Sequence, residues 1–539
     1  MSSFVRSLAI VADPPSLADN SGDLDRLRRV VRETLADGLP VDFPLTHVGA
    51  LCRRFRKAGF QGTALVNDLG DRWVVADFMG EAPDLLAGVA LDLGTTHLEA
   101  TLIDMGNGRV LARADRVNDQ IEYGVDILSR IHFATAARRL EKNLDPDFVD
   151  PGLVTLQRVV RDCINALLAD LAAAAGLEPE NVRALAVSGN TTMVHFFLGL
   201  DPYHLCREPY IPMINQPGIV TAKELGLSLH PAAPIWIMPS IGSYFGGDLI
   251  SGILASGLSE GDETRMLIDV GTNAEVVVGN REWLIACAGA AGPALEGGVA
   301  RMGMRAGPGA IDRVNIHPVS LEFTYTTIAN APAVGICGSG LIDLVAALYL
   351  SRVIDIQGRL RDPALEKNGE RAAFMAARIV ENEGQRAFVI VPATEAAGDE
   401  PILLEQLDLD ALMRSKAAMY AILTTLLGQV GLEFDDLHEI CVAGAFGGHI
   451  DPLRAVTLGM LPDLDLSVYR AIGNSSLHGA ELALCDQASR QACSRIVAQI
   501  TYVELNVNQE FMIRFSGSRF IPHTDPSLFP SVPFYNDNS

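Results

Sequence analysis

The chain has 539 residues, with 42 lysines and arginines against 66 aspartates and glutamates, and its formal net charge at pH 7 is −24. Nucleic-acid binding depends on lysines and arginines that displace counterions from phosphates, so this acidic balance excludes DNA and RNA as expected partners. Hydrophobic residues make up 49% and charged residues 20% of the chain, which is a globular composition and excludes a disordered chain. The length predicts about two to four domains.

The eight cysteines are scattered through the sequence without a C-x-x-C pair. This distribution favours buried thiols in a reducing compartment over a metal or cluster site. The uncharged stretch over residues 225–247 is long enough to cross a bilayer, but three prolines within it would break a spanning helix. The sequence therefore predicts a cytoplasmic protein.

Residues 1–88 are predicted to form a small α+β domain. Leucines and valines recur at helical spacing over residues 24–35, and Asp19 or Ser21 is the expected N-cap of that helix. A short strand precedes it, and a second helix and two short strands follow. No residue pattern in this domain points to catalysis.

Beyond residue 88 a strand, a Gly-Thr turn and a second strand occur twice, at residues 90–103 and 267–278. The two copies align Asp92 with Asp269, Gly94 with Gly271, and Thr95 with Thr272. Long helical and strand segments follow each copy. This internal duplication predicts two α/β lobes with a cleft between them, a first lobe over 89–265 and a second over 266–539 that includes the C-terminal segment.

Each D-x-G-T turn presents consecutive backbone N–H groups, which favour an anion such as a phosphate. Side chains at the turns add further donors, namely Thr95, Thr96, Thr272 and Asn273. Asp92 and Asp269 suit a hydrated magnesium ion, which takes few carboxylates, and both are predicted as metal ligands and catalytic residues. A single D-x-G-T is usually an ordinary hairpin, but two matching copies favour turns that face each other and together bind a Mg-triphosphate.

A strand that runs into a Gly-rich turn forms a third motif, at residues 440–448. Its small residues leave space for a flat ring such as adenine, and the predicted contacts are Gly444, Ala445, Gly447 and Gly448. A tight strand-to-helix connection is the structural alternative. Gly338 and Ser339 open a further helix, where the N–H groups would either bind phosphate or allow close packing, and packing is favoured.

Three acidic residues are further catalytic candidates. Asp248 follows a Gly-rich turn and is placed to reach the metal or the attacking water, with a helix N-cap as an equal alternative. Glu275 and Glu296 are weaker candidates for positioning water. His97 and His195 lie beside the motifs, and a structural role is favoured for both.

The order and content of the three motifs resemble the acetate and sugar kinase, Hsp70 and actin (ASKHA) superfamily. That resemblance implies an α/β, duplicated, two-lobed actin-like ATPase fold, preceded here by the small α+β domain. It also implies ATP and Mg²⁺ as cofactors, with phosphates at the Gly94 and Gly271 turns and adenosine near Gly444 and Gly447.

A narrower resemblance covers almost the whole chain. Four motifs, at residues 188–195, 290–297, 336–343 and 502–505, resemble the ATP-dependent reductive activators of corrinoid proteins. These proteins return an oxidised cob(II)alamin protein to cob(I)alamin, the state that transfers methyl groups. The resemblance implies a corrinoid protein as partner and a homodimer.

The sequence departs from this family at its N-terminus. Typical members begin with a ferredoxin domain whose cysteines hold a [2Fe–2S] cluster in a C-x₄-C-x₂-C spacing, which this chain lacks. No iron-sulfur cluster is therefore expected in this chain. The electron is expected either from a separate ferredoxin-type donor or from a domain that has been removed.

Three functions remain open on the sequence. Reductive activation of a corrinoid methyl-transfer protein is the function that the narrower resemblance implies. A small-molecule kinase would use the same cleft with a substrate pocket and a base near the γ-phosphate. A non-catalytic scaffold of a corrinoid methyltransferase complex would bind nucleotide without turnover.

Overall fold

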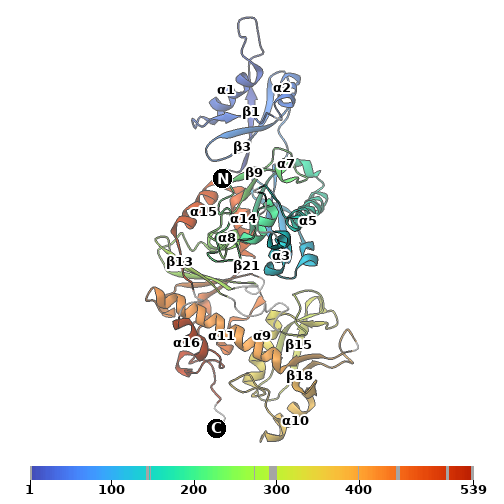
Figure 1. Ribbon diagram of the computed structural model, residues 1–539, viewed down its shortest axis with the longest axis vertical. Coiled ribbons are helices and arrows are strands. Elements are labelled where there is room, and N and C mark those ends of the chain that lie inside the picture. Colours follow the sequence, from blue (N-terminus) through green and yellow to red (C-terminus); the bar gives the residue numbers. More distant parts are fainter. Residues whose placement is uncertain are drawn as a thin grey trace. The chain divides into compact units, whose positions relative to one another are not determined.

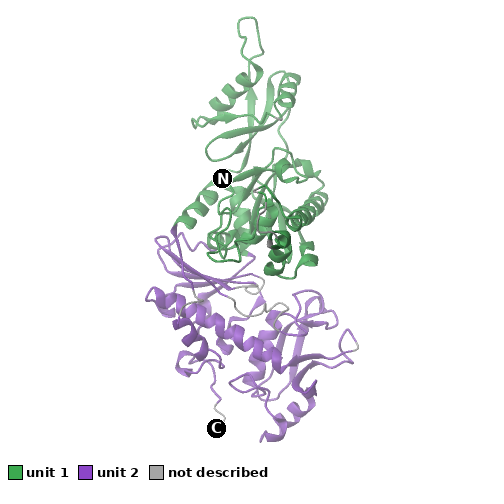
Figure 2. Cartoon of the chain, viewed as in Figure 1, with its two compact units in different colours: residues 1–255, 475–498 green, residues 256–474, 499–539 purple. Residues whose placement is uncertain are grey.

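The computed structural model describes residues 3–45, 47–140, 145, 147–271, 274–289, 300–398, 400–444, 449–504 and 509–535. The chain divides into two compact units (Figure 2). The first consists of Met1–Ala255 with Ser475–Ala498, and the second of Ser256–Asn474 with Gln499–Ser539. The domain boundaries expected from the sequence stay a prediction, but residues 475–498 pack with the first unit although they follow the second repeat.

The first unit opens with a small α+β domain. Its sheet has the order β1-β3-β4-β2, formed by β1 (Val5–Val11), β2 (Val41–Asp42), β3 (Gln61–Asp68) and β4 (Trp73–Met79). Helices α1 (Asp23–Leu35) and α2 (Val48–Lys57) cover the sheet, because leucine, valine and phenylalanine at three- and four-residue spacing bury one face of each helix.

The expected N-cap of α1 is wrong. Gly22 occupies the N-cap position without a side-chain hydrogen bond. Asp19 instead accepts hydrogen bonds from the Arg26 guanidinium at 2.5 Å and from the Ser21 backbone N–H at 3.1 Å. The buried Arg26 guanidinium therefore engages the carboxylate that the sequence assigned to the helix end.

A six-stranded sheet with the order β7-β6-β5-β8-β10-β9 forms the centre of the first unit. Its strands are β5 (Ala87–Leu93), β6 (His97–Asp104), β7 (Arg109–Val117), β8 (Val182–Gly189), β9 (Ile219–Thr221) and β10 (Pro234–Ile237). Strands β5, β6 and β7 form an antiparallel meander, whereas β8 runs parallel to β5 and β10 runs parallel to β8.

Helices cover both faces of this sheet (Figure 1). They are α3 (Ile127–Ala134), α4 (Ala136–Leu140), α5 (Pro151–Ala175), α6 (Thr191–Leu198), α7 (Ala222–Leu225), α8 (Gly247–Ser256), α14 (Ser475–Cys485) and α15 (Gln487–Gln499). The leucines of α5 share a core with Leu91 and Val187, while Leu477 and Ala480 of α14 pack on Ala90 and Ala186. Because neighbouring residues of a strand point to opposite faces, α5 and α14 lie on opposite sides of the sheet.

The second unit contains a sheet with the order β21-β20-β11-β12-β13-β22. Its strands are β11 (Arg265–Val270), β12 (Ala274–Gly279), β13 (Leu284–Gly289), β20 (Glu439–Ala443), β21 (Tyr469–Gly473) and β22 (Ile500–Tyr502). Again three consecutive strands form an antiparallel meander, and the fourth and fifth join in parallel beside the first. This shared strand order confirms the internal duplication predicted from the sequence.

Two small sheets extend the second unit between β13 and β20. The first is β15-β14-β16, from β14 (Ala310–Ile316), β15 (Phe323–Thr327) and β16 (Gly335–Ile336), and the second is β17-β18-β19, from β17 (Ile379–Asn382), β18 (Gln385–Val391) and β19 (Ile402–Glu405). The helices are α9 (Gly338–Leu350), α10 (Gly369–Arg378), α11 (Gln406–Gln429), α13 (Pro452–Leu458) and α16 (Gln509–Gly517). Helices α9 and α11 are buried along most of their length and carry the core of this unit.

A buried lysine anchors the C-terminal tail to this core. The Lys416 ammonium on α11 donates to the backbone carbonyls of Leu458 at 2.8 Å, Phe520 at 2.6 Å and Pro522 at 2.6 Å. Three acceptors match the three donors of an ammonium group, so its burial is compensated.

Candidate functional site

The first predicted phosphate turn joins β5 to β6 and is held through its carbonyl groups. The Asn118 side chain donates to the Gly94 carbonyl at 3.0 Å, and the Asn118 backbone N–H donates to the Thr96 carbonyl at 2.9 Å. The guanidinium of Arg130 donates to the Thr95 carbonyl at 2.6 Å. A β-carbon on Gly94 would lie 2.3 Å from the His97 carbonyl oxygen, so only glycine fits this hairpin. No residue pattern predicted a role for Asn118 or Arg130.

A second motif lies beside this turn because β8 runs parallel to β5, with Gly189 opposite Leu93. Asn190 follows β8, and its side-chain amide donates to the Thr95 hydroxyl at 3.1 Å. Its side-chain oxygen accepts from the Met193 N–H at 3.0 Å and caps α6. One residue thus ties the threonine of the turn to the start of a helix.

Asp92 lies near the end of β5 and has a partner from a distant part of the chain. The Ser476 hydroxyl, in the first turn of α14, donates to Asp92 Oδ1 at 2.6 Å. Sequence reasoning missed Ser476. Helix α14 follows β21, which lies beside β20 in the second sheet, as α8 follows β10, which lies beside β8 in the first.

Asp248 lies in the first turn of α8, which begins at Gly247. Its Oδ1 accepts a hydrogen bond from the Leu249 N–H at 2.9 Å, and burial raises its pKa to about 6. A β-carbon on the preceding Gly246 would lie 2.5 Å from Asp248 Oδ1 and 2.4 Å from the Asn190 α-carbon. The absent side chain at Gly246 therefore lets Asp248 approach Asn190. A carboxyl group that titrates near neutral pH suits a role in accepting a proton.

The second repeat brings Asp269 next to the third motif. Strand β20 runs parallel to β11 with Ala443 opposite Asp269. Gly444 follows with a φ of 80°, and a β-carbon there would lie 3.0 Å from Asp269 Oδ1 and 2.7 Å from the Val270 carbonyl oxygen. In contrast, a β-carbon on Gly271 would meet nothing within 4 Å. The predicted site residues Thr272, Asn273, Ala445, Gly447 and Gly448, and the weaker candidate Glu296, lie outside the described residues.

Each repeat places a glutamate opposite its aspartate on the neighbouring strand. Glu99 pairs with Asp92 between β5 and β6, and Glu275 pairs with Asp269 between β11 and β12. The predicted catalytic candidate Glu275 thus lies beside Asp269. Because Glu99 holds the matching position, the acidic pair is a property of both repeats.

The start of α9 is built for close packing. A β-carbon on Gly340 would lie 2.2 Å from the Ile311 carbonyl oxygen, so the helix lies directly on β14. Ser339 is 8% exposed, and its hydroxyl donates to the Asp312 carbonyl at 3.2 Å. These contacts support the packing alternative for Gly338 and Ser339, whose nucleotide contact stays a prediction.

His195 has the contacts of a structural histidine. Its Nδ1 lies 2.7 Å from the Thr191 carbonyl oxygen, and its Nε2 accepts from the Met213 N–H at 3.2 Å. Burial lowers its pKa, which keeps the ring neutral at physiological pH.

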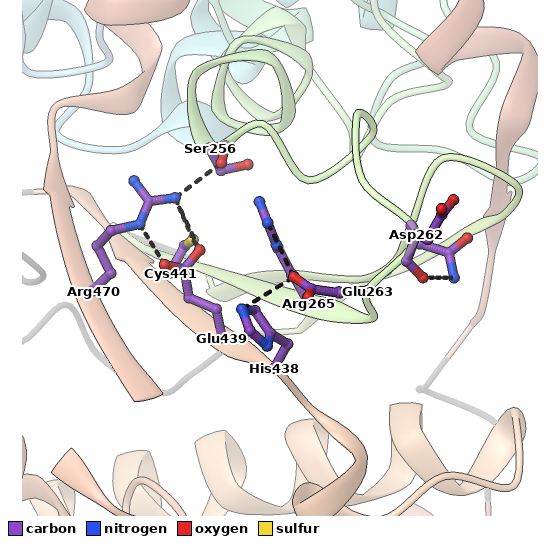
Figure 3. A network of polar contacts seen from close by, with 9 residues as sticks. Ser256, Asp262, Glu263, Arg265, His438, Glu439, Cys441 and Arg470 are labelled. Carbon is purple, nitrogen blue, oxygen red and sulfur yellow. Dashed lines mark hydrogen bonds and ion pairs between the residues drawn. The ribbon is translucent and has the colours of Figure 1, made fainter. Parts of the chain in front are cut away.

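A polar network fixes β20 at the end opposite Gly444 (Figure 3). Arg470 on β21 donates to the Glu439 carboxylate at 2.7 and 3.0 Å, to the Cys441 sulfur at 3.2 Å and to the Ser256 carbonyl at 2.9 Å. Burial raises the pKa of the Cys441 thiol to about 12. Cys441 is therefore a protonated structural thiol, as expected for the scattered cysteines, and all eight cysteines are free of disulfides.

Each repeat supplies carboxylate side chains near the end of a central strand. Within the described ranges, no group of three or more His, Cys, Asp or Glu side chains has the geometry to hold a metal. Magnesium commonly keeps its waters and binds through one or two carboxylates together with substrate phosphates. Asp92 in the first repeat and Asp269 in the second are each a single carboxylate beside a Gly-containing turn, which is compatible with this mode of magnesium binding.

Models of three protein regions match the chain in order. The RACo linker region matches residues 1–80, the RACo middle region matches 87–261, and the C-terminal domain of RACo, the ASKHA domain, matches 263–533. The corrinoid activation enzyme RamQ of Eubacterium limosum is 30% identical over 493 residues, which cover 91% of this chain and 78% of RamQ. The chain belongs to the RACo family.

Two further comparisons agree with membership of the RACo family. The [Co(II) methylated amine-specific corrinoid protein] reductase of Methanosarcina barkeri is 23% identical over 445 residues, which cover 77% of this chain and 73% of the reductase. The solved structure of a reductive activator for corrinoid, iron-sulfur protein is 35% identical, with a TM-score of 0.86 over 98% of this chain and 81% of that chain.

The RACo regions follow the architecture described above. The linker region spans the small α+β domain, the middle region spans the first six-stranded sheet, and the ASKHA domain spans the second. The predicted α/β ASKHA fold and the resemblance to corrinoid activators are confirmed. None of the helices in the described part of this RACo-family chain is long and apolar enough to cross a membrane.

Proposed function

We propose that the chain is an ATP-dependent activase that returns a corrinoid protein from the cob(II)alamin to the cob(I)alamin state. The observation that carries this proposal is the match of all three RACo regions, in order, across nearly the whole chain. Relatives named as a corrinoid activation enzyme and as a Co(II) corrinoid protein reductase support it.

Both repeats are proposed to contribute to nucleotide binding. In the first, Gly94, Thr95 and Thr96 bind phosphate through a turn whose carbonyls are already held by Asn118 and Arg130. In the second, the corresponding residues are Gly271, Thr272 and Asn273. The proposed adenosine contacts are Gly444, Ala445, Gly447 and Gly448.

The aspartates have separate proposed tasks. Asp92 and Asp269 hold the hydrated Mg²⁺ of the nucleotide, and their positions near the ends of central strands keep the carboxylates in place. Asp248 accepts a proton from the attacking water, since burial brings its pKa to about 6. Glu275 positions water beside Asp269. Bound ATP supplies the free energy of its binding and hydrolysis.

An uphill one-electron reduction needs the activase to favour one state of its partner. A bound ligand shifts an equilibrium only by its difference in affinity for the two states. We propose that the ATP-bound chain binds the corrinoid protein in a form whose cobalt is easier to reduce, and that hydrolysis releases it. The proposed electron donor is a separate ferredoxin-type protein, and the proposed assembly is a homodimer in the cytoplasm.

A spectroscopic assay tests this function. The purified chain, a cob(II)alamin protein of a methyltransferase system and a low-potential reductant are mixed with Mg-ATP, and the cob(I)alamin absorbance is recorded. We expect the cob(I) signal only with Mg-ATP, together with phosphate release that the corrinoid protein stimulates. Omission of Mg²⁺ and replacement of ATP by a non-hydrolysable analogue are the controls. Phosphate transfer to a metabolite would indicate a kinase, and binding without turnover a scaffold.

A further inference from the structure

Three serine hydroxyls form a continuous chain that ends on the Asp92 carboxylate. The Ser251 hydroxyl on α8 donates to the Ser188 hydroxyl on β8 at 2.8 Å. The hydroxyls of Ser188 and Ser476 are also 2.8 Å apart, and Ser476 on α14 donates to Asp92 Oδ1 at 2.6 Å. All four residues belong to the first unit, although 384 positions of sequence separate Asp92 from Ser476.

The direction of this chain follows from the number of protons. Each serine hydroxyl carries one proton. The proton of Ser476 is used on Asp92, so Ser188 must be the donor in its contact with Ser476. The order is therefore Ser251 to Ser188 to Ser476 to Asp92, and each inner hydroxyl both accepts and donates. Successive bonds of this kind polarise one another and strengthen the last bond to the carboxylate.

The three serines are buried, so their hydroxyls do not serve to contact solvent. Ser188 and Ser251 are 0% exposed and Ser476 is 7% exposed. Their surroundings are apolar, since Ala184, Ala186 and Leu477 pack in the same layer. A buried hydroxyl costs free energy unless it is hydrogen-bonded, and alanine would fill such a layer without that cost.

The backbone fixes the positions of all three serines. Strand register places Ser188 directly opposite Asp92 between β5 and β8. Helices α8 and α14 approach at Gly479, where a β-carbon would lie 2.5 Å from the Ser251 α-carbon. Any larger residue at Gly479 would separate the two helices that carry Ser251 and Ser476. The chain of hydroxyls is thus positioned by the register of a sheet and by a close helix contact.

We propose that Ser476, held by Ser188 and Ser251, is a positioning residue that fixes the Asp92 carboxylate for binding Mg-nucleotide. This inference rests on the nucleotide-binding role proposed above for Asp92. It assigns a task to Ser188 and to the otherwise unexplained start of α14. A positioning residue acts through another group, so its loss should weaken the metal-dependent step while the fold remains.

The test compares variants at two adjacent serines. Ser476→Ala removes the bond to Asp92, whereas Ser475→Ala removes a neighbouring buried hydroxyl for which the described residues supply no hydrogen-bond partner. Mg²⁺-dependent binding of a fluorescent ATP analogue, phosphate release and the thermal unfolding midpoint are measured for each. We expect Ser476→Ala to weaken the apparent Mg²⁺ affinity about 10–100-fold, as loss of such a supporting bond does at other metal sites. Ser475→Ala should match the wild type.

Three further variants keep the test decisive. Ser476→Thr retains a hydroxyl and should restore most of the Mg²⁺ affinity. The Ser188→Ala variant should show a smaller loss in the same direction, and it serves if Ser476→Ala does not fold. Asp92→Ala combined with Ser476→Ala should bind no worse than Asp92→Ala alone, because the two residues act as one unit.

The outcomes separate this inference from the proposed function. If Asp92→Ala loses Mg-nucleotide binding while Ser476→Ala and Ser188→Ala both match the wild type, the positioning role is wrong and the nucleotide role stands. If the wild type binds no Mg-nucleotide, or Asp92→Ala binds it normally, both proposals fail. A loss in Ser476→Ala that Ser476→Thr does not restore also overturns the positioning role.

Discussion

Gly444 lies against Asp269, because a β-carbon on Gly444 would be 3.0 Å from Asp269 Oδ1. The backbone there has a φ of 80°, a conformation that glycine adopts without cost. The Gly-rich turn of the third motif therefore begins beside Asp269, one residue before the end of β11. These two residues are far apart in the sequence. A side chain at Gly444, the first glycine of the motif, would crowd the Asp269 carboxylate.

Gly444→Ala should displace the Asp269 carboxylate, because the added β-carbon would lie 3.0 Å from Oδ1. We expect Mg-nucleotide affinity to fall by about tenfold, which corresponds to about 1.4 kcal/mol. Gly431→Ala is the matched control, because Gly431 has a φ of 68° and open space around its β-carbon position. Both variants share the backbone strain of about 1–2 kcal/mol. Nucleotide titrations that show equal losses for the two variants would contradict crowding of Asp269.

Asp269→Ala should abolish metal-dependent nucleotide turnover, because it removes a proposed ligand of the hydrated Mg²⁺. Phosphate release at saturating ATP measures this, and Asp269→Asn should fail similarly because an amide carries no charge. The exposed Asp435, in the same unit, provides the control variant Asp435→Ala. A turnover rate unaffected in Asp269→Ala would remove this residue from the site.

Asp248→Asn should raise the stability of the chain at neutral pH. The pKa of Asp248 is about 6 in the folded chain against 3.8 in the reference state, so the folded chain binds the proton more tightly. The stabilising contribution of this proton is complete below pH 3.8 and is lost as the pH rises through about 6.

Relative to the wild type, the unfolding free energy of Asp248→Asn should therefore increase by about 2–3 kcal/mol between pH 4 and pH 7.5. Thermal unfolding midpoints across this pH range measure the change. The exposed Asp115 on β7 supplies the control variant Asp115→Asn, which makes the same chemical change at the surface. If the stability difference between Asp248→Asn and the wild type does not change with pH, Asp248 does not bind a proton more tightly in the folded chain. The same variant should lose ATP turnover if Asp248 accepts the proton of water.

Lys416→Met should destabilise the second unit by about 2–4 kcal/mol, because it leaves three backbone carbonyl groups, in two buried hydrogen bonds and one partly buried one, without their donor. Lys367→Met, at an exposed lysine of the same unit, should change stability by less than about 0.5 kcal/mol. Chemical unfolding of both variants, followed by limited proteolysis of the tail around Phe520, measures the effect. If the tail of Lys416→Met resists proteolysis as well as the wild-type tail does, apolar contacts are sufficient to hold the tail and the prediction is wrong.

The repeats could be predicted from the sequence because their signals are local. A strand, its turn and the returning strand lie within about a dozen residues, and two aligned copies reinforce each other. The shared sheet order then follows from the duplication. Asp92, Gly94 and Asp269 were predicted in this way, and each lies at or next to the end of a strand, while their role in a site stays a prediction.

The supporting residues could not be predicted because their partners are distant. Ser476 lies far from Asp92 in sequence, and two serines before an apolar run look like any helix start. Arg130 and Asn118 reach the first turn through tertiary packing that no periodicity reveals. The N-cap of α1 was mispredicted for the same reason. The Asp19 carboxylate accepts a hydrogen bond from the buried Arg26 instead of capping the helix.

The placement of residues 475–498 in the first unit has a consequence for biosynthesis. A chain that leaves the ribosome from its N-terminus reaches these residues only after the entire 256–474 segment has been translated. Until then, the alanine-rich sheet face that α14 covers stays bare, and the nascent first half is open to aggregation or chaperone capture. Premature termination before Ser475 should therefore yield insoluble product rather than a stable half-molecule.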